Sequence, residues 1–220
     1  MKGLAFQKIN LVSVGLLLIA ACITDLALLY YGGKQIPGYN QLTSSISLLG
    51  ASGSPVSRLM SAWSVVLGVF FVLFGLEFRI VFISPKKEIR QASFLIILYG
   101  LGEGVASGIF KFDHVVGTFN LSALVHNILG GIGVISLLLL PFVMKKIFSV
   151  ASYPTFHHIS NLIWLIGIVA ILFFTFRIDY FNNTFLNTYK GLWQRIFLVN
   201  YYVYFCVISI LMIQKIKLKT

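Results

Sequence analysis

Residues 92–111 read ASFLIILYGLGEGVASGIFK, and this stretch decides what kind of fold the chain has. A helix over this stretch would be about 30 Å long at 1.5 Å per residue, which is the thickness of a membrane's hydrocarbon core. Its only acidic residue is Glu103, and Gly100, Gly104 and Gly108 recur at every fourth position. Small residues at this spacing let membrane helices approach each other closely. The stretch therefore predicts a tightly packed transmembrane helix that carries one carboxyl group into the bilayer.

The composition of the whole chain points to the same class of protein. The chain has 220 residues, of which 58% are hydrophobic and only 10% charged, and its mean hydropathy is +0.93. A soluble domain has about 25% charged residues. The formal net charge of +11 comes from Lys and Arg residues scattered over the ends of several apolar runs. This scatter is typical of membrane topology signals and argues against a nucleic-acid-binding face.

Apolar runs long enough to cross a membrane occur six times in the chain. We therefore expect an all-α, polytopic bundle of six transmembrane helices. The expected spans are residues 9–31, 59–83, 92–111, 119–144, 159–178 and 192–213. No polar stretch is long enough to form a second core, so residues 1–220 are expected to form one membrane domain.

The distribution of basic residues predicts the orientation of the bundle. Most of the 17 Lys and Arg residues lie on the side of the two chain ends. By the positive-inside rule, both termini are expected to be cytoplasmic, in a multi-pass protein of the cell inner (plasma) membrane. The longest outer connection is then residues 32–58, which contains the turn signals Gly32-Gly33, Pro37-Gly38 and Gly53-Ser54-Pro55. Its middle part, residues 42–49, is expected to lie on the membrane or to cap the bundle.

Polar side chains lie inside four of the predicted spans and fall close to one level. Counted at 1.5 Å per residue from the outer end of each span, their depths run from about 5 Å to about 13 Å. In order of depth they are Arg195, Asp25, His126, Asn200 and Glu103. A charge inside the bilayer costs about 2.5–3.5 kcal/mol, so such residues generally face a partner, water or a ligand. Their shared depth predicts a polar pocket in the outer leaflet half, covered by residues 32–58.

We expect this pocket to bind a lipid or a small amphiphile, with Arg195 holding an anionic group. The expected ligand-binding residues are Arg195, Glu103, His126, Asn127, Asp25, Asn200, Ser47 and His114. A binding protein is favoured over an enzyme, because no known nucleophile motif surrounds the serines. The expected partners are membrane lipids, with other membrane protein subunits as a further possibility and no nucleic acid.

The residues alone leave several alternatives open. Arg195 could form a structural ion pair with Glu103 or Asp25 that locks the bundle. The pocket could be an intramembrane hydrolase or transferase site in which His126 acts with Asp25, Glu103 or His114. The chain could also be a membrane subunit of a larger complex, because a glycine stripe offers a close packing surface. A transporter is disfavoured, because the six spans show no inverted repeat.

No metal and no cofactor are expected. The side chains of His114, His126, Asp113, Asp25 and Glu103 are of types that bind metals. However, the sequence contains neither an HExxH motif nor two histidines one helical turn apart, so metal-dependent hydrolysis is weakly supported. It also lacks a phosphate-binding loop and a dinucleotide fingerprint.

Several short motifs resemble those of a known family. They are Tyr39-Asn40, Ser45-Ile46-Ser47-Leu48-Leu49-Gly50, Gly53-Ser54-Pro55, His126-Asn127 with Gly130, and Gly191-Leu192-Trp193-Gln194-Arg195-Ile196. Together they resemble the domain of unknown function 998 family, a group of six-span bacterial and archaeal membrane proteins. A fainter similarity leads to FRAG/DRAM/Sfk-type membrane proteins. The first family implies no activity, whereas the second group is linked to lipid distribution and so favours a lipid-facing role.

Overall fold

The structure is a computed structural model that describes residues 2–82, 86–113, 119–175 and 185–218. Within these ranges it describes the side chains from Val14 to Lys217. All regular elements in these ranges are helices. The long ones are α1 (Lys2–Lys34), α3 (Ser57–Val81), α4 (Lys87–Tyr99), α6 (Leu121–Ile147), α7 (Pro154–Thr175) and α9 (Lys190–Leu218). The short ones are α2 (Ser47–Gly50), the π-helix η1 (Gly100–Ala106), α5 (Ser107–Ile109) and α8 (Phe185–Thr188).

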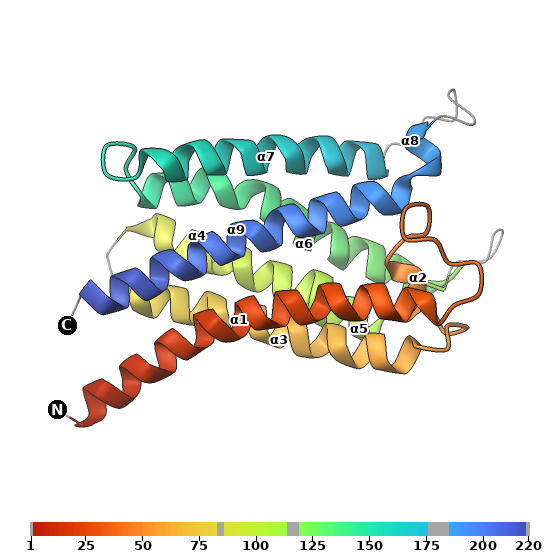
Figure 1. Cartoon of the computed structure of the whole chain (residues 1–220), viewed down its shortest axis with the longest axis horizontal. Helices are drawn as coiled ribbons and strands as arrows, with labels where there is room; N and C mark the ends of the chain where they lie inside the picture. The colour runs from red at the N-terminus through yellow and green to blue at the C-terminus, as the bar shows by residue number, and fades with distance from the viewer. Residues whose placement is uncertain (1, 83–85, 114–118, 176–184, 219–220) are drawn as a thin grey trace.

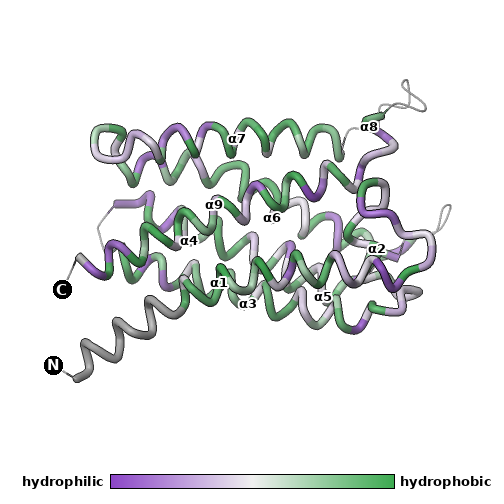
Figure 2. Tube along the Cα trace, viewed as in Figure 1, coloured by the Kyte–Doolittle hydropathy of each residue, from purple (hydrophilic) through white to green (hydrophobic). Residues whose placement is uncertain are grey.

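Six helical segments in the described residues are long and apolar enough to cross a membrane. They are Val14–Lys34, Ser57–Val81, Lys87–Ile109, Leu121–Ile147, Pro154–Thr175 and Lys190–Lys217. The expected all-α bundle of six spans is thereby confirmed. The third and fifth segments begin five residues earlier than the apolar runs suggested, because polar residues continue a helix beyond its apolar part. Figure 2 shows hydrophilic residues gathered at the two ends of the bundle.

The spans are arranged as a closed ring. In this ring α1 contacts α3, α3 contacts α4, α4 contacts α6, α6 contacts α7, α7 contacts α9, and α9 returns to α1. Both chain termini lie at one end of the bundle, and α2 and α8 lie at the other end (Figure 1). We refer to these as the terminus end and the loop end.

A layer of aromatic rings fills the centre of the ring of helices. Phe71 lies 4.8 Å from Tyr99 and 4.7 Å from Phe205, measured between ring centroids. Tyr202 stacks on Phe71 at 6.2 Å. These four side chains are almost fully buried. Aromatic pairs at such distances stabilise a fold by more than the burial of their surface area alone. The layer therefore stabilises the core between the loop end and the terminus end.

Glycines bring the third span into backbone contact with the second. A Cβ atom on Gly104 would overlap the Cα of Gly68, and one on Gly100 would lie 2.7 Å from the Gly68 carbonyl oxygen. Further along, a Cβ on Gly108 would lie 2.6 Å from the carbonyl oxygen of Ser61. The glycine stripe of the sequence therefore packs on α3. Side chains at these positions would push the two helices apart.

We expect Gly104→Ala to lower the thermal stability of the purified protein, because the added methyl group meets backbone atoms that cannot move aside. Overpacking of this kind costs about 1–3 kcal/mol. The matched control is Gly131→Ala, since a Cβ there meets nothing within 4 Å. That variant should keep its melting temperature or gain up to about 1 kcal/mol from helix propensity. Equal melting temperatures for the two variants would contradict the packing described here.

Candidate functional site

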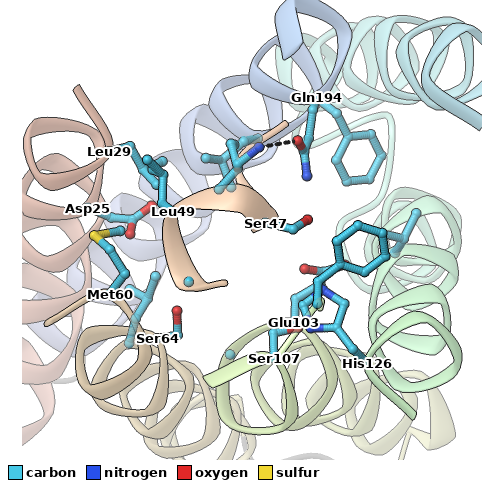
Figure 3. Close-up of a pocket in the computed structure, with 18 of the residues that line it drawn as sticks. Asp25, Leu29, Ser47, Leu49, Met60, Ser64, Glu103, Ser107, His126 and Gln194 are labelled. Carbon is cyan, nitrogen blue, oxygen red and sulfur yellow. Dashed lines mark hydrogen bonds between the residues drawn. The ribbon is translucent and has the colours of Figure 1, made fainter. Parts of the chain in front are cut away.

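A cavity of about 150 Å³ lies among the spans at the loop end of the bundle. All six spans contribute to its wall, and α2 lies across it with Ser47 pointing inward (Figure 3). The polar residues of the lining are Asp25, Ser47, Ser61, Ser64, Tyr99, Glu103, Ser107, Lys111, His126, Gln194 and Tyr202. The rest of the lining is mainly Leu, Ile, Met and Phe side chains. A cavity of this size accepts a benzene-sized group or the polar head of a larger molecule.

Glu103 is fixed in this wall by the glycines around it. It lies in the π-helix η1, between Gly102, which packs on the Leu129 carbonyl of α6, and Gly104, which packs on α3. A Cβ on Gly133 would lie 3.1 Å from the Cγ of Glu103, so the glycines of α6 leave room for this side chain. Such π-helical turns are frequent at functional sites.

The Glu103 carboxylate faces the cavity without a hydrogen-bond donor from any described residue. A Cβ on Gly130 would lie 3.0 Å from its Oε1 and 3.8 Å from the Oγ of Ser107, which places these two oxygens on the same side. Figure 3 shows Glu103, Ser107 and His126 together on one side of the cavity and Asp25 on the opposite side. Glu103 is half-buried in a largely apolar wall, where a polar group without a partner is costly, so this carboxylate calls for a ligand or water.

His126 has one ring nitrogen fixed by the backbone. Its Nδ1 lies 2.8 Å from the carbonyl oxygen of Phe110. Because a carbonyl oxygen only accepts, Nδ1 carries the hydrogen of this bond. In the neutral ring Nε2 then has a free lone pair and acts as an acceptor.

Asp25 is buried, and protein donors fill both of its oxygens. The indole Nε1 of Trp63 donates to Oδ1 at 2.8 Å, and the hydroxyl of Tyr202 donates to Oδ2 at 2.7 Å. These bonds join α1 to α3 and to α9. Asp25 therefore ties three spans together at the wall of the cavity.

Arg195 is not part of the cavity lining, because its guanidinium group holds the loop above it. Nη1 donates to the carbonyl oxygens of Ser44 and Gly191, both at 3.0 Å. Nη2 donates to the hydroxyl of Tyr39 and to Oε1 of Gln41, both at 2.7 Å. No ion pair joins Arg195 to Asp25 or Glu103, all of which lie within the described residues. The structural ion pair considered as an alternative is thus replaced by an anchor between α9 and the loop.

Two further bonds hold the same loop on α9. The backbone N–H of Ile46 donates to Oε1 of Gln194 at 2.7 Å, drawn as a dashed line in Figure 3. The N–H of Leu192 donates to the carbonyl oxygen of Leu42 at 2.8 Å. Since Ile46 and Ser47 also line the cavity, the anchor on α9 positions the cover of the cavity.

Of the other residues expected to bind a ligand, two lie outside the cavity lining and one lies outside the described residues. Asn200 donates to the carbonyl oxygen of Ile163 at 2.8 Å, joining α9 to α7 outside the lining. Asn127 is exposed and lies outside the lining. His114 lies outside the described residues. No group of three or more His, Cys, Asp and Glu side chains suited to a metal ion occurs within the described ranges.

The cavity also contains residues that sequence reasoning missed. Ser64, Ser107, Lys111 and Gln194 belong to the lining. Ser107 follows Glu103 by four positions, a spacing that places two side chains on one helical face. This spacing was a usable signal for Ser107. The sequence holds no comparable signal for Ser64, because its approach to the cavity depends on how α3 is rotated about its axis.

At the loop end, a second set of hydrogen bonds joins Asp113, which follows α5, to Ser52 in the loop before α3. The carboxylate of Asp113 accepts from the Ser52 backbone N–H at 2.7 Å and from the Ser52 hydroxyl at 2.6 Å. These bonds hold the pKa of the exposed Asp113 carboxyl below its ordinary value. Asn120, the N-cap of α6, donates to the Asp113 carbonyl oxygen at 2.8 Å. The start of α6 thus positions Asp113 beneath the loop.

A ring of six apolar helices with a polar-lined cavity at one end defines a multi-pass membrane protein. Residues 12–211 match the family described as protein of unknown function (DUF998). The chain belongs to this family, and the resemblance noted from its short motifs is confirmed. The similarity to FRAG/DRAM/Sfk-type proteins stays a prediction. Comparison with curated proteins and with solved structures gives no match.

We expect Arg195→Ala to release the loop from α9. Hydrogen bonds to a charged group contribute about 1.5–3 kcal/mol each and are not additive, so local opening should become easier by about 2–4 kcal/mol. Hydrogen exchange of the backbone amides in residues 39–49 measures this opening. Arg58→Ala is the control, because Arg58 is exposed at the same end of the bundle. Unchanged exchange in Arg195→Ala would contradict the anchor.

The bond between Asp113 and Ser52 predicts a pH dependence. A carboxyl whose pKa is lowered on folding stabilises the protein above the pKa of the unfolded chain, about 3.9, and loses this effect as the pH falls through the folded pKa. Asp113→Asn should therefore melt below the wild type at pH 6, and the difference should shrink as the pH falls through the lowered pKa of the Asp113 carboxyl. Measuring the difference cancels all other titrating groups. A difference that persists at low pH would contradict the prediction.

Proposed function

We propose that this protein binds a lipid or a small amphiphile whose polar head occupies the cavity. The observation that carries the proposal is the Glu103 carboxylate, which faces the cavity without a donor from the described residues. The lining around it is otherwise largely apolar. A mixed lining with a few convergent polar groups fits a molecule that has one polar and one apolar part.

The hydrogen-bond partners of Asp25, Arg195 and His126 support a ligand at Glu103 more than at these residues. Both carboxylate oxygens of Asp25 and both Nη atoms of Arg195 have protein partners. His126 has one nitrogen filled and one free. An ionisable residue inside a membrane protein that lacks a protein partner is a functional-site candidate. Within this proposal Arg195 positions the cover of the cavity, and Glu103 meets the ligand.

The orientation expected from the basic residues supports an outward-facing site. With both termini cytoplasmic, the loop end lies on the outer side of the plasma membrane. The cavity then lies in the outer leaflet half, beneath the loop that Arg195 anchors. A ligand would reach it from the outer leaflet or from the adjoining aqueous phase.

Acid–base catalysis on a lipid is the second candidate function, and one observation favours it. The bond from Nδ1 of His126 to the Phe110 carbonyl leaves Nε2 as a proton acceptor on the same side of the cavity as Glu103. Nε2 could act there as a general base of a hydrolase or transferase. Time-dependent cleavage of a bound lipid that His126→Gln abolishes would favour this function over binding alone.

We expect gently purified protein to carry a bound amphiphile that native mass spectrometry detects. Ser47→Phe should lose it, because Ser47 points into the cavity (Figure 3) and a phenyl ring there fills the space. Leu48→Phe is the matched control, since the neighbouring Leu48 is 40% exposed and lies outside the lining. This variant should retain the ligand. Equal amounts in both variants, or none in the wild type, would contradict the proposal.

A further inference from the structure

We infer that the head of the ligand carries a primary ammonium group, which the Glu103 carboxylate binds. The inference rests on the proposed amphiphile-binding function and specifies the chemistry of its ligand. Three features of the site support it: the charges of the described lining residues, the free hydrogen-bonding atoms, and the position of Lys111, the one Lys or Arg among the described lining residues.

With both carboxyls ionised, the ionisable side chains among the described lining residues have a net negative charge. The charged ones are then Asp25, Glu103 and Lys111, two carboxylates against one ammonium group. The Lys111 ammonium donates to the Ser57 hydroxyl at 2.8 Å and follows the last residue of α5 by two positions. Since Asp25 is held by two protein donors, Glu103 is the carboxylate left to be neutralised. A cationic group complements it, and an anionic head would be repelled.

The free atoms on the Glu103 side of the cavity are mainly acceptors. The carboxylate offers two oxygens, and Nε2 of His126 offers a lone pair because Nδ1 holds the hydrogen of the bond to Phe110. The Ser107 hydroxyl donates to the Gly102 carbonyl at 3.3 Å, which leaves its oxygen free to accept. A primary ammonium group has three N–H donors. It satisfies this set with an ion pair to Glu103 and further N–H donors, whereas a hydroxyl head is uncharged and has a single donor.

The packing around Glu103 leaves the cavity as the open side for such a partner. Oε1 approaches α6 so closely that a Cβ on Gly130 would lie 3.0 Å away. Behind the residue, Gly104 is in backbone contact with Gly68 of α3. Neither helix has room for a further side chain at these contacts. A counter-charge for Glu103 must therefore enter through the cavity.

The test uses three probes that share one chain and differ only in the head: dodecylamine, dodecanol and dodecanoate. The protein is reconstituted in phosphatidylcholine nanodiscs, and native mass spectrometry measures the bound fraction of each probe. We expect dodecylamine to bind at least about tenfold more tightly than dodecanol, with dodecanoate weakest. Glu103→Gln should abolish the preference for the amine while still binding dodecanol.

Glu77→Gln is the matched control. Glu77 lies within α3, near the terminus end, and like Glu103 it carries a carboxyl group. Its Oε2 is buried without a hydrogen-bond partner among the described residues. The wild-type preference for dodecylamine should persist in this variant. A preference that persists in Glu103→Gln, or that disappears in Glu77→Gln, would overturn the assignment to Glu103.

The outcomes separate the two proposals. If none of the three probes binds, the proposed function itself fails. If all three bind equally well to the wild type, amphiphile binding stands and the ammonium inference is overturned.

A competition experiment identifies the natural source of the ammonium group. Displacement of dodecylamine by phosphatidylethanolamine, but not by added phosphatidylglycerol, supports a lipid headgroup. Retention of dodecylamine against both lipids supports a free single-chain amine. Displacement by phosphatidylglycerol would overturn the inference, because that head is anionic.

Discussion

The close approach of η1 to its two neighbours is the constraint on which the rest of the structure depends. Gly100 and Gly104 meet Gly68 of α3, while Gly102 meets the Leu129 carbonyl of α6. With backbone contacts on two sides, the third span cannot rotate about its axis without a clash. Glu103, between two of these glycines, is thereby held in one direction. The cavity wall follows from this packing.

Polar groups within the bilayer must find partners inside the protein, and here these partners also build the site. Asp25 is bonded by Trp63 and Tyr202, which come from two other spans. Arg195 is bonded by the loop that covers the cavity. The bonds that stabilise the bundle thus shape the wall and cover around Glu103. Glu103 differs because its neighbours are glycines, which bring no donor side chain.

Hydropathy predicted the six spans because it is a local property of the chain, and counting residues placed Asp25, His126 and Glu103 near one level. Depth does not specify the rotation of a helix or the fold of a loop. The partners of Arg195, such as Tyr39 and Gln41, precede it by about 150 positions and approach it only through the folded loop. The π-helical turn depends on contacts with two other spans. For these reasons the sequence could predict that Asp25, His126 and Glu103 lie near one another, but it could not predict the separate role of each polar residue.

This division of roles changes the expected charge of the cavity lining, and with it the charge of the ligand that fits. Had Arg195 faced the cavity, the lining would have been balanced and an anionic head would fit. With its guanidinium bonded to the loop, the net charge of the lining is set by Asp25, Glu103 and Lys111. Two carboxylates at similar depth then differ only in their neighbours, donors for Asp25 and glycines for Glu103. In our proposal, the residue that lacks donors selects a ligand that supplies them, and this requirement favours a cation.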